Sequence, residues 1–223
     1  MLGQFGPFFA AVLVTSVSQG REGMRGFFGR FLRWRAHVAW VAVSLFLLPG
    51  TMLAAIYAYA YFHGSVASLY LRGEWWTLLW HFAYMIVLGG PLGEEPGWRG
   101  FALPRLQDAY GPVMGSLWLG VLHSVWHLPL WWMYPPPCPF WMFVAGGILV
   151  TFLFTWLFNH TQGSVLYSLL FHTSMSVASV RLPEVPAYHV WVLVLSAVVA
   201  SVFLSDPRLG YGVRSANEYE IGE

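Results

Sequence analysis

Seven apolar stretches divide this chain of 223 residues, and most of them are about as long as a bilayer is thick. A membrane helix needs roughly 20 apolar residues, whereas open strands and loops leave backbone polar groups unsatisfied in lipid. We therefore expect an all-α, polytopic membrane helical bundle of about seven to eight membrane helices, including one short helix that carries polar motifs. The predicted spans lie near residues 5–18, 38–62, 76–91, 112–130, 140–158, 164–181 and 188–205.

The composition supports a membrane protein. Hydrophobic residues make up 57% of the chain and charged residues only 9%, which is unlike a soluble domain. A net charge of +1 gives no support for nucleic-acid binding, and the single Cys138 excludes an internal disulfide. We expect the lipid bilayer as a partner and a multi-pass location in the inner membrane of a bacterial or archaeal cell.

The predicted organisation is one integral membrane domain in four parts. Residues 1–74 hold N-terminal membrane helices, 75–182 the polar motifs, 183–205 the last membrane helix, and 206–223 a polar, disordered tail. The loop 20–37 carries five arginines against one glutamate, so the positive-inside rule predicts that it is cytoplasmic. An amphipathic helix lying on anionic lipid is the alternative for this segment, with the same sidedness.

Two adjacent acids, Glu94 and Glu95, stand out against the apolar background. An ionisable group within a membrane protein's apolar region is a functional-site hypothesis by default. Glycines and a proline just before the acids break the third span, and Pro96 suits the first turn of a new helix. We expect a separate short helix over 94–107, with both acids near its positive N-terminal end.

Helical spacing separates the roles of the two acids. Glu95 and Arg99 share a helix face and can pair, which turns Glu94 to another face. A turn near 108–112 would join helix 94–107 to the next span as a hairpin. At ~1.5 Å per residue, Glu94 and His127 then lie at the same end, with His123 about one turn away.

A third polar cluster lies on another span, where His172 and Ser176 share a face. A carboxylate and a histidine in a water-accessible pocket can activate water, with the carboxylate later protonating the leaving amine. A neutral histidine can orient the water or stabilise an oxyanion. The open alternative is Zn²⁺ held by one glutamate and two histidines, although the HExxH signature is absent.

Structural roles compete with each of these functional ones. Glu94, Glu95 and Arg99 would then be an ion-pair cluster at a helix start, and His127 or His172 a hydrogen-bonded structural histidine. For His123 we expect packing or a supporting role.

Together, the three clusters resemble the CPBP intramembrane proteases, the CAAX-protease and bacteriocin-processing family also called Abi. Its EExxxR motif matches Glu94, Glu95 and Arg99, and its FxxxH motif matches His127, with His123 at the usual Phe position. Its HxxxN-like motif matches His172, with Ser176 in place of Asn. The resemblance covers roughly residues 75–180.

The resemblance implies an endopeptidase that cuts a membrane-associated peptide or protein, of prenylated CAAX type or bacteriocin type, at the cytoplasmic side. Glu94 and His127 would activate water, His172 and Ser176 would form the oxyanion hole, and Glu95 with Arg99 would organise the site. Both a cofactor-free glutamate mechanism and a mechanism with one divalent metal ion such as Zn²⁺ are compatible with the family. A catalytically silent immunity or scaffold protein of this fold and a small proton-coupled transporter remain alternatives.

Overall fold

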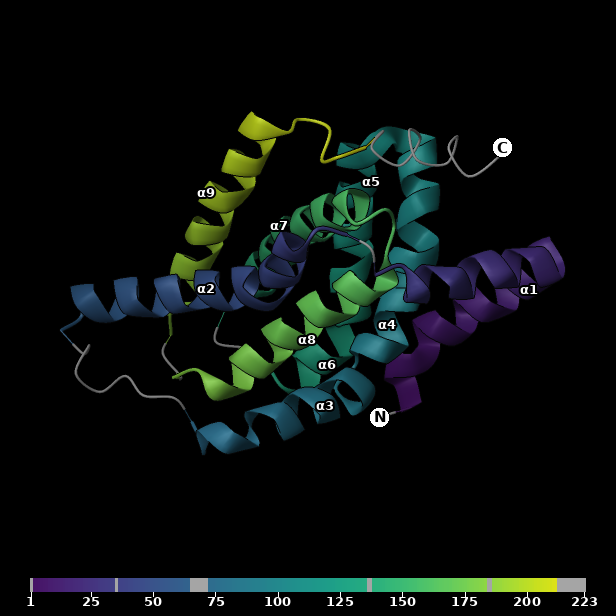
Figure 1. Ribbon diagram of the computed structural model, residues 1–223. Coiled ribbons are helices and arrows are strands. Elements are labelled where there is room, and N and C mark those ends of the chain that lie inside the picture. The colour runs from purple at the N-terminus through teal and green to yellow at the C-terminus, as the bar shows by residue number, and fades with distance from the viewer. Residues whose placement is uncertain (1, 35, 65–71, 136–137, 184–185, 212–223) are drawn as a thin grey trace.

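The computed structural model describes residues 2–34, 36–64, 72–135, 138–183 and 186–211, which form helices and connecting turns with no β-strand among them (Figure 1). The expected all-α class is thus confirmed. The predicted disordered tail lies outside the described residues from position 212 onward. The α-helices are α1 (Gly6–Gly29), α2 (Val38–Phe62), α3 (Leu78–Leu88), α4 (Pro91–Gly97), α5 (Leu103–Trp126), α6 (Leu128–Met133), α7 (Phe140–His160), α8 (Val165–Arg181) and α9 (Tyr188–Ser205). Short turns of other helical type are η1 (Leu2–Phe5), η2 (Arg30–Leu32), η4 (Trp75–Thr77) and the π-helical η5 (Trp98–Ala102).

The main core lies among α2, α7, α8 and α9. Its fully buried side chains include Leu48, Phe154, Leu157, Phe171 and Leu195. A second cluster joins α5 to α7 and α8. These helices carry apolar residues on most faces, as expected for helices that contact lipid on the outside and one another on the inside.

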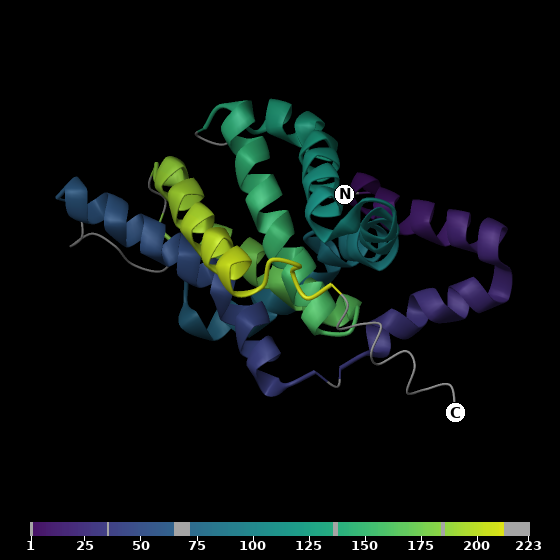
Figure 2. The same cartoon turned by 90° about the horizontal axis from the view of Figure 1, so that it is seen from above.

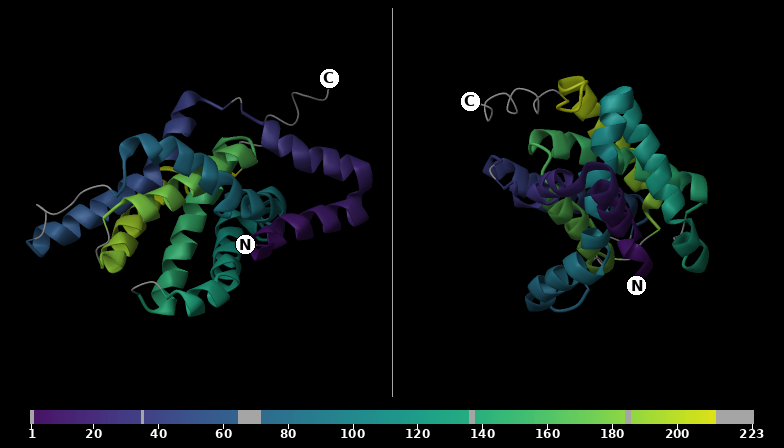
Figure 3. Two further views of the ribbon diagram at one scale, coloured as in Figure 1. Left: turned by 90° about the horizontal axis from the view of Figure 1, so that it is seen from below. Right: turned by 90° about the vertical axis from the view of Figure 1, so that its right-hand side faces the viewer.

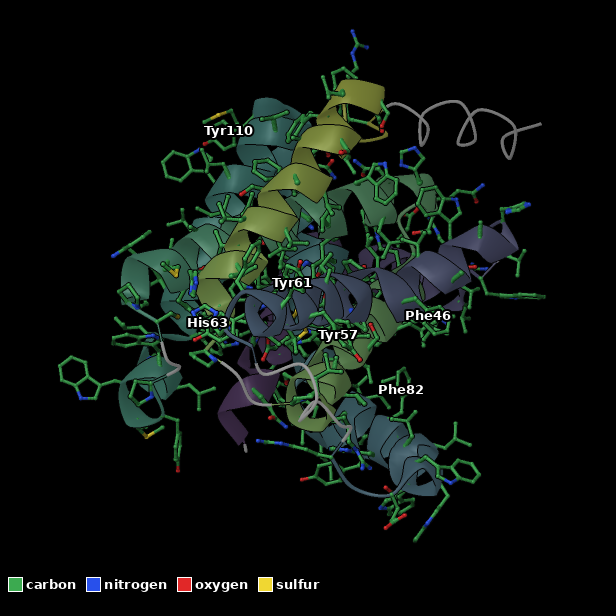
Figure 4. All side chains as sticks on the ribbon, turned by 90° about the vertical axis from the view of Figure 1, so that its left-hand side faces the viewer. Phe46, Tyr57, Tyr61, His63, Phe82 and Tyr110 are labelled. Carbon is green, nitrogen blue, oxygen red and sulfur yellow. The ribbon has the colours of Figure 1, made fainter. Side chains whose placement is uncertain are left out.

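Three helices are long and apolar enough to cross a membrane, namely α2, α7 and α9. The protein is therefore an integral membrane protein. Aromatic side chains of α2 point away from the bundle, where Phe46 is 68% and Tyr61 74% exposed (Figure 4). The number of crossings made by the remaining helices stays a prediction.

The arginine-rich segment is helical rather than a loop. Helix α1 continues through it to Gly29 and bends only at Gly20, where φ is 59° and ψ is −147°. This backbone conformation favours glycine, and Arg, Glu, Met and Gln around it are good helix formers. The two arms of α1 form a hairpin that projects from the bundle (Figures 2 and 3). The loop prediction for 20–37 was wrong over most of its length, and the helical alternative describes it better.

Helix α5 contains the predicted hairpin bend. Gly111 has φ 77° and ψ 170°, and the chain reverses there between two helical arms. Beyond the bend, small and hydroxyl residues of the second arm pack closely on α7. The Ser116 hydroxyl donates to Thr155 Oγ1 at 2.6 Å, and Gly120 lies against the backbone of Ile148. These contacts fix the arm that carries the two histidines.

Candidate active site

Both acids of the motif lie on the short helix α4. The helix begins at Pro91, earlier than predicted, after Gly90 adopts a φ of 112°. Glu94 therefore lies in its first turn, as expected from the charge preference of helix N-termini. The predicted single helix over 94–107 is instead interrupted by the π-helical turn η5, a feature common at functional sites.

Glu95 is the centre of a buried ionic cluster. Arg99 Nη1 donates to Glu95 Oε1 at 2.8 Å, as the four-residue spacing predicts, and both side chains are fully buried. The Arg99 guanidinium also lies 3.7 Å from the centre of the Phe154 ring. The third member is His172, whose Nδ1 is 2.7 Å from the same Glu95 oxygen. Sequence reasoning missed this contact, because it joins helices 77 residues apart.

Glu94 faces two histidines, His123 in the last turn of α5 and His127 just after the end of that helix. Its Oε2 atom is 3.2 Å from His123 Nε2 and 3.9 Å from His127 Nε2. The hairpin thus brings Glu94 and His127 together as predicted, but His123 makes the shorter contact. His123 also packs against the Trp98 and His127 rings, so the expected packing or supporting role stays a prediction beside its contact with Glu94.

Hydrogen bonding fixes the orientation of His127. Its Nδ1 is 2.9 Å from the His123 carbonyl oxygen, which can only accept a hydrogen bond, so Nδ1 carries the proton. In the neutral ring, Nε2 then presents a lone pair toward Glu94 Oε2. These two acceptors, His127 Nε2 and Glu94 Oε2, lie 3.9 Å apart, so a group with two donor hydrogens can bridge them.

The buried cluster has more acidic than permanently basic groups. Glu94 and Glu95 are 6% and 0% exposed, Arg99 is fully buried, and His172 is 8% exposed. With both carboxylates ionised and Arg99 charged, these groups would sum to −1. Because an uncompensated buried charge is costly, a proton on a neighbouring imidazole would complete the balance. Such a proton would be available for acid–base chemistry.

A cavity of about 470 Å³ adjoins these groups. His123, His127, His172 and Ser176 line it, while Glu94 lies one layer behind, in contact with the first two. The other walls are mainly apolar side chains of α2, α7 and α9. The cavity thus joins a polar, hydrogen-bonding wall to apolar walls that can hold a hydrophobic ligand.

The donor set next to the cavity also suits a divalent cation. Glu94, His123 and His127 each offer one ligand atom, and these atoms lie within 4.8 Å of one another. One carboxylate and two imidazoles are ligands that Zn²⁺ accepts, and the bond from His127 Nδ1 to a carbonyl is the usual support for a metal-binding histidine.

Comparisons with known proteins agree with these motifs. Residues 74–178 match the family described as type II CAAX prenyl endopeptidase Rce1-like. The protein named CAAX prenyl protease 2 from Methanococcus maripaludis is 27% identical over 131 residues, which cover 57% of this chain and 48% of that protein. The chain thus spans about half the length of this curated relative. The matched region contains all three motifs, so both comparisons support the resemblance to the CPBP family that the motifs indicate.

Proposed function

We propose that this protein is an intramembrane endopeptidase that hydrolyses peptide bonds by water activated between Glu94 and His127. The observation that carries the proposal is the pair of facing acceptors, Glu94 Oε2 and His127 Nε2, 3.9 Å apart beside a cavity. A water molecule between them would donate one hydrogen to each, which aims an oxygen lone pair at a bound carbonyl carbon.

In the proposed reaction Glu94 is the general base. As the water oxygen bonds to the carbonyl carbon, its proton passes to the Glu94 carboxylate. When the carbon–nitrogen bond breaks, Glu94 returns that proton to the leaving amine. The products are a carboxylic acid and an amine, which exchange the remaining water proton to leave a carboxylate and an ammonium group, and the enzyme regains its starting protonation state.

His172 and Ser176 are the proposed oxyanion donors. Both line the cavity from one face of α8. His172 Nδ1 is engaged by Glu95, so Nε2 can donate to the oxyanion when the ring carries the proton of the buried cluster. The Ser176 hydroxyl is the second donor, on a side chain shorter than that of asparagine. Glu95 and Arg99 act as positioning residues for His172.

The proposed substrate is a membrane-associated peptide or protein, of prenylated CAAX type or bacteriocin type. The apolar walls contributed by α2 and α9 favour a hydrophobic segment beside the scissile bond. The relative's name points to the CAAX type. A direct cleavage assay decides which of these two substrate classes the protein cuts.

The decisive test compares membrane proteomes of cells that produce the native protein or Glu94→Gln. The variant keeps the shape of the side chain but removes the base, so an uncut substrate should accumulate. On a purified cognate peptide, kcat should fall by about 10²–10⁴-fold. Glu22→Gln, an exposed acid of α1, is the matched control. Full peptidase activity in Glu94→Gln would remove Glu94 from the mechanism. Identical proteomes, with no cleavage by the native protein, would leave a silent scaffold as the function, and proton-linked solute uptake would support the transporter.

His123 favours a metal-dependent form of the same function. Glu94, His123 and His127 would hold the ion, which when bound supplies a Lewis acid beside the substrate carbonyl. His123 stands at the Phe position of the FxxxH motif, so His123→Phe separates the two routes. Loss of activity together with loss of about one equivalent of bound metal supports the metal route. If His123→Phe retains activity and chelators do not inhibit it, the reaction does not depend on a metal ion.

A further inference from the structure

The cavity of the candidate active site contains a polar side chain that the proposed reaction does not use. Tyr188, the first residue of α9, lines the cavity from a different helix than the histidines. Two serines of the wall, Ser124 and Ser179, each donate to a carbonyl of their own helix at 2.8 Å. Trp191 donates to Thr51 Oγ1 at 3.0 Å.

The Tyr188 hydroxyl differs from these groups, because it forms no hydrogen bond with any of the described residues. It is also not one of the enclosed polar atoms that lack a partner, so part of it stays accessible. A tyrosine hydroxyl in an apolar setting usually finds a hydrogen-bond partner. A ligand in the cavity would supply that partner.

The neighbours of Tyr188 hold its ring in one orientation. The ring packs edge-on against Trp191, with ring centres 5.3 Å apart and planes at 72°. Trp191 is itself anchored to α2 through Thr51. The hydroxyl lies directly on the backbone of α7, because a Cβ atom on Gly146 would come within 2.7 Å of it. An orientation fixed before binding lowers the entropy that a ligand must offset.

The same stretch of α7 connects Tyr188 to the proposed water-activating pair. Phe143 and Gly146 both line the cavity, and their spacing places them on one face of the helix. Along α7 they are ~4.5 Å apart. The Phe143 ring centre lies 6.2 Å from the centre of the His127 ring. Because an extended peptide advances ~3.3 Å per residue, a chain cut beside His127 would pass Tyr188 about two or three residues from the cut.

We propose that Tyr188 is a substrate-binding residue whose hydroxyl donates a hydrogen bond to a backbone carbonyl about two or three residues from the scissile bond. This inference rests on the proposed peptidase function. Met52, Ile56 and Ala187 make the nearby walls apolar. A peptide carbonyl that enters such surroundings loses its hydrogen bonds to water and needs a donor. The contact would hold the chain in the register that presents the scissile carbonyl to the water.

Tyr188→Phe tests the proposal, because it removes only the hydroxyl. The probe is a fluorescently labelled, S-farnesylated CAAX-type peptide, the class that the relative's name indicates. KM should rise about threefold to tenfold, the value of one neutral hydrogen bond. We expect kcat to stay nearly unchanged, since the contact is remote from the reacting atoms. The control is Tyr61→Phe, which removes an exposed hydroxyl of α2 outside the cavity.

Thioamide peptides locate the contact. Sulfur accepts hydrogen bonds more weakly than oxygen, so a thioamide at the contacted residue should weaken binding to the native protein but not weaken it further in Tyr188→Phe. A general structural defect would instead act alike on every peptide of the series.

Gly146→Ala provides an independent check, because the added methyl group would displace the Tyr188 hydroxyl. The substitution should raise KM in the native protein. It should have little effect in Tyr188→Phe, where there is no hydroxyl oxygen to displace.

Binding of the peptide to Glu94→Gln, with and without Tyr188→Phe, separates this inference from the proposed function. Added Tyr188→Phe should raise the Kd by the same factor as KM, although Glu94→Gln does not turn over. If the native protein cleaves the peptide but Tyr188→Phe leaves KM and Kd unchanged, the inference fails and the peptidase stands. If the native protein binds the peptide without cleaving it, the peptidase fails, and a raised Kd in Tyr188→Phe still supports the contact. No saturable binding of the peptide would overturn the inference.

Discussion

The two glutamates of the motif differ in what surrounds them. Glu95 meets Arg99 and His172 at a single oxygen, so its charge is committed to fixed partners. Glu94 meets two imidazoles, one of which faces it with a lone pair. Spacing within the motif predicts the Glu95–Arg99 pair. The Glu95–His172 contact depends on how α8 packs against α4, which one sequence does not reveal.

Ser176 departs from the asparagine usual in the family, and we expect this difference to limit the rate. It lines the cavity one turn after His172, where a longer amide would reach further toward an oxyanion. One well-placed oxyanion donor is worth about 10²–10³-fold in kcat, so Ser176→Asn should raise kcat by about tenfold or more. Single-turnover cleavage of the cognate peptide measures the effect. Ser179→Asn, on an exposed residue of the same cavity wall, is the control, and an unchanged kcat in Ser176→Asn would exclude this donor role.

Among the elements, α4 depends on two glycines that face the start of the chain. Gly93 and Gly97 are four residues apart and share one helix face. A Cβ atom on Gly93 would meet the backbone of Gln4, and one on Gly97 would meet the backbone of Pro7. The side chain of Gln4 also donates to the Leu88 carbonyl at 2.9 Å. The N-terminal segment thus holds the acid-bearing helix in place.

We predict that Gly97→Ala disturbs this contact and with it the position of Glu94. The added methyl group would overlap the backbone near Pro7, and overpacking of this kind costs about 1–3 kcal/mol. The melting midpoint in detergent should fall, and kcat should fall more than KM changes. Gly29→Ala is the control, since its Cβ would meet nothing within 4 Å. If both variants behave like the native protein, the N-terminal segment does not position α4.

Hydropathy predicted most helices because lipid-facing and core-facing residues are both apolar. The stretches 38–62, 140–158 and 188–205 closely match α2, α7 and α9. It did not predict the π turn at Trp98–Ala102. Hydropathy also did not predict the bend at Gly20, because a glycine within a helical pattern does not by itself indicate that the chain reverses direction there.

Across the whole molecule, the arginine-rich segment and the cavity beside Glu94 lie at opposite ends of α7. Arg30 and Arg33 adjoin Gly163, just after the end of α7, whereas Phe143 and Gly146 line the cavity near its beginning. Helix α2 repeats this arrangement, since it starts close to Arg33 and lines the cavity only from Met52 onward. If α2 and α7 both cross the bilayer, a cytoplasmic arginine segment would place the cavity on the opposite side from these arginines, whereas the predicted cleavage is at the cytoplasmic side.

We give priority to the positive-inside rule, because the arginines are clustered close to the ends of the apolar helices. The cavity should then be nearer the outer surface of the membrane. Cys138, the only cysteine of the chain, precedes α7 at the cavity end and serves as a natural reporter. In right-side-out spheroplasts, a membrane-impermeant maleimide should label Cys138. In a Cys138→Ser background, Glu74→Cys should also be labelled, whereas Arg25→Cys should react only after lysis.

Detergent-solubilised samples of the same three proteins control for burial of the thiols, since every cysteine that reacts there is chemically accessible. The reverse pattern, with Arg25→Cys labelled in spheroplasts and Cys138 protected until lysis, would orient the cavity toward the cytoplasm. In that case the arginines of α1 would be held outside against the positive-inside rule, and α1 would have to lie on the outer leaflet. The labelling thus fixes the side of the membrane from which a substrate enters the cavity.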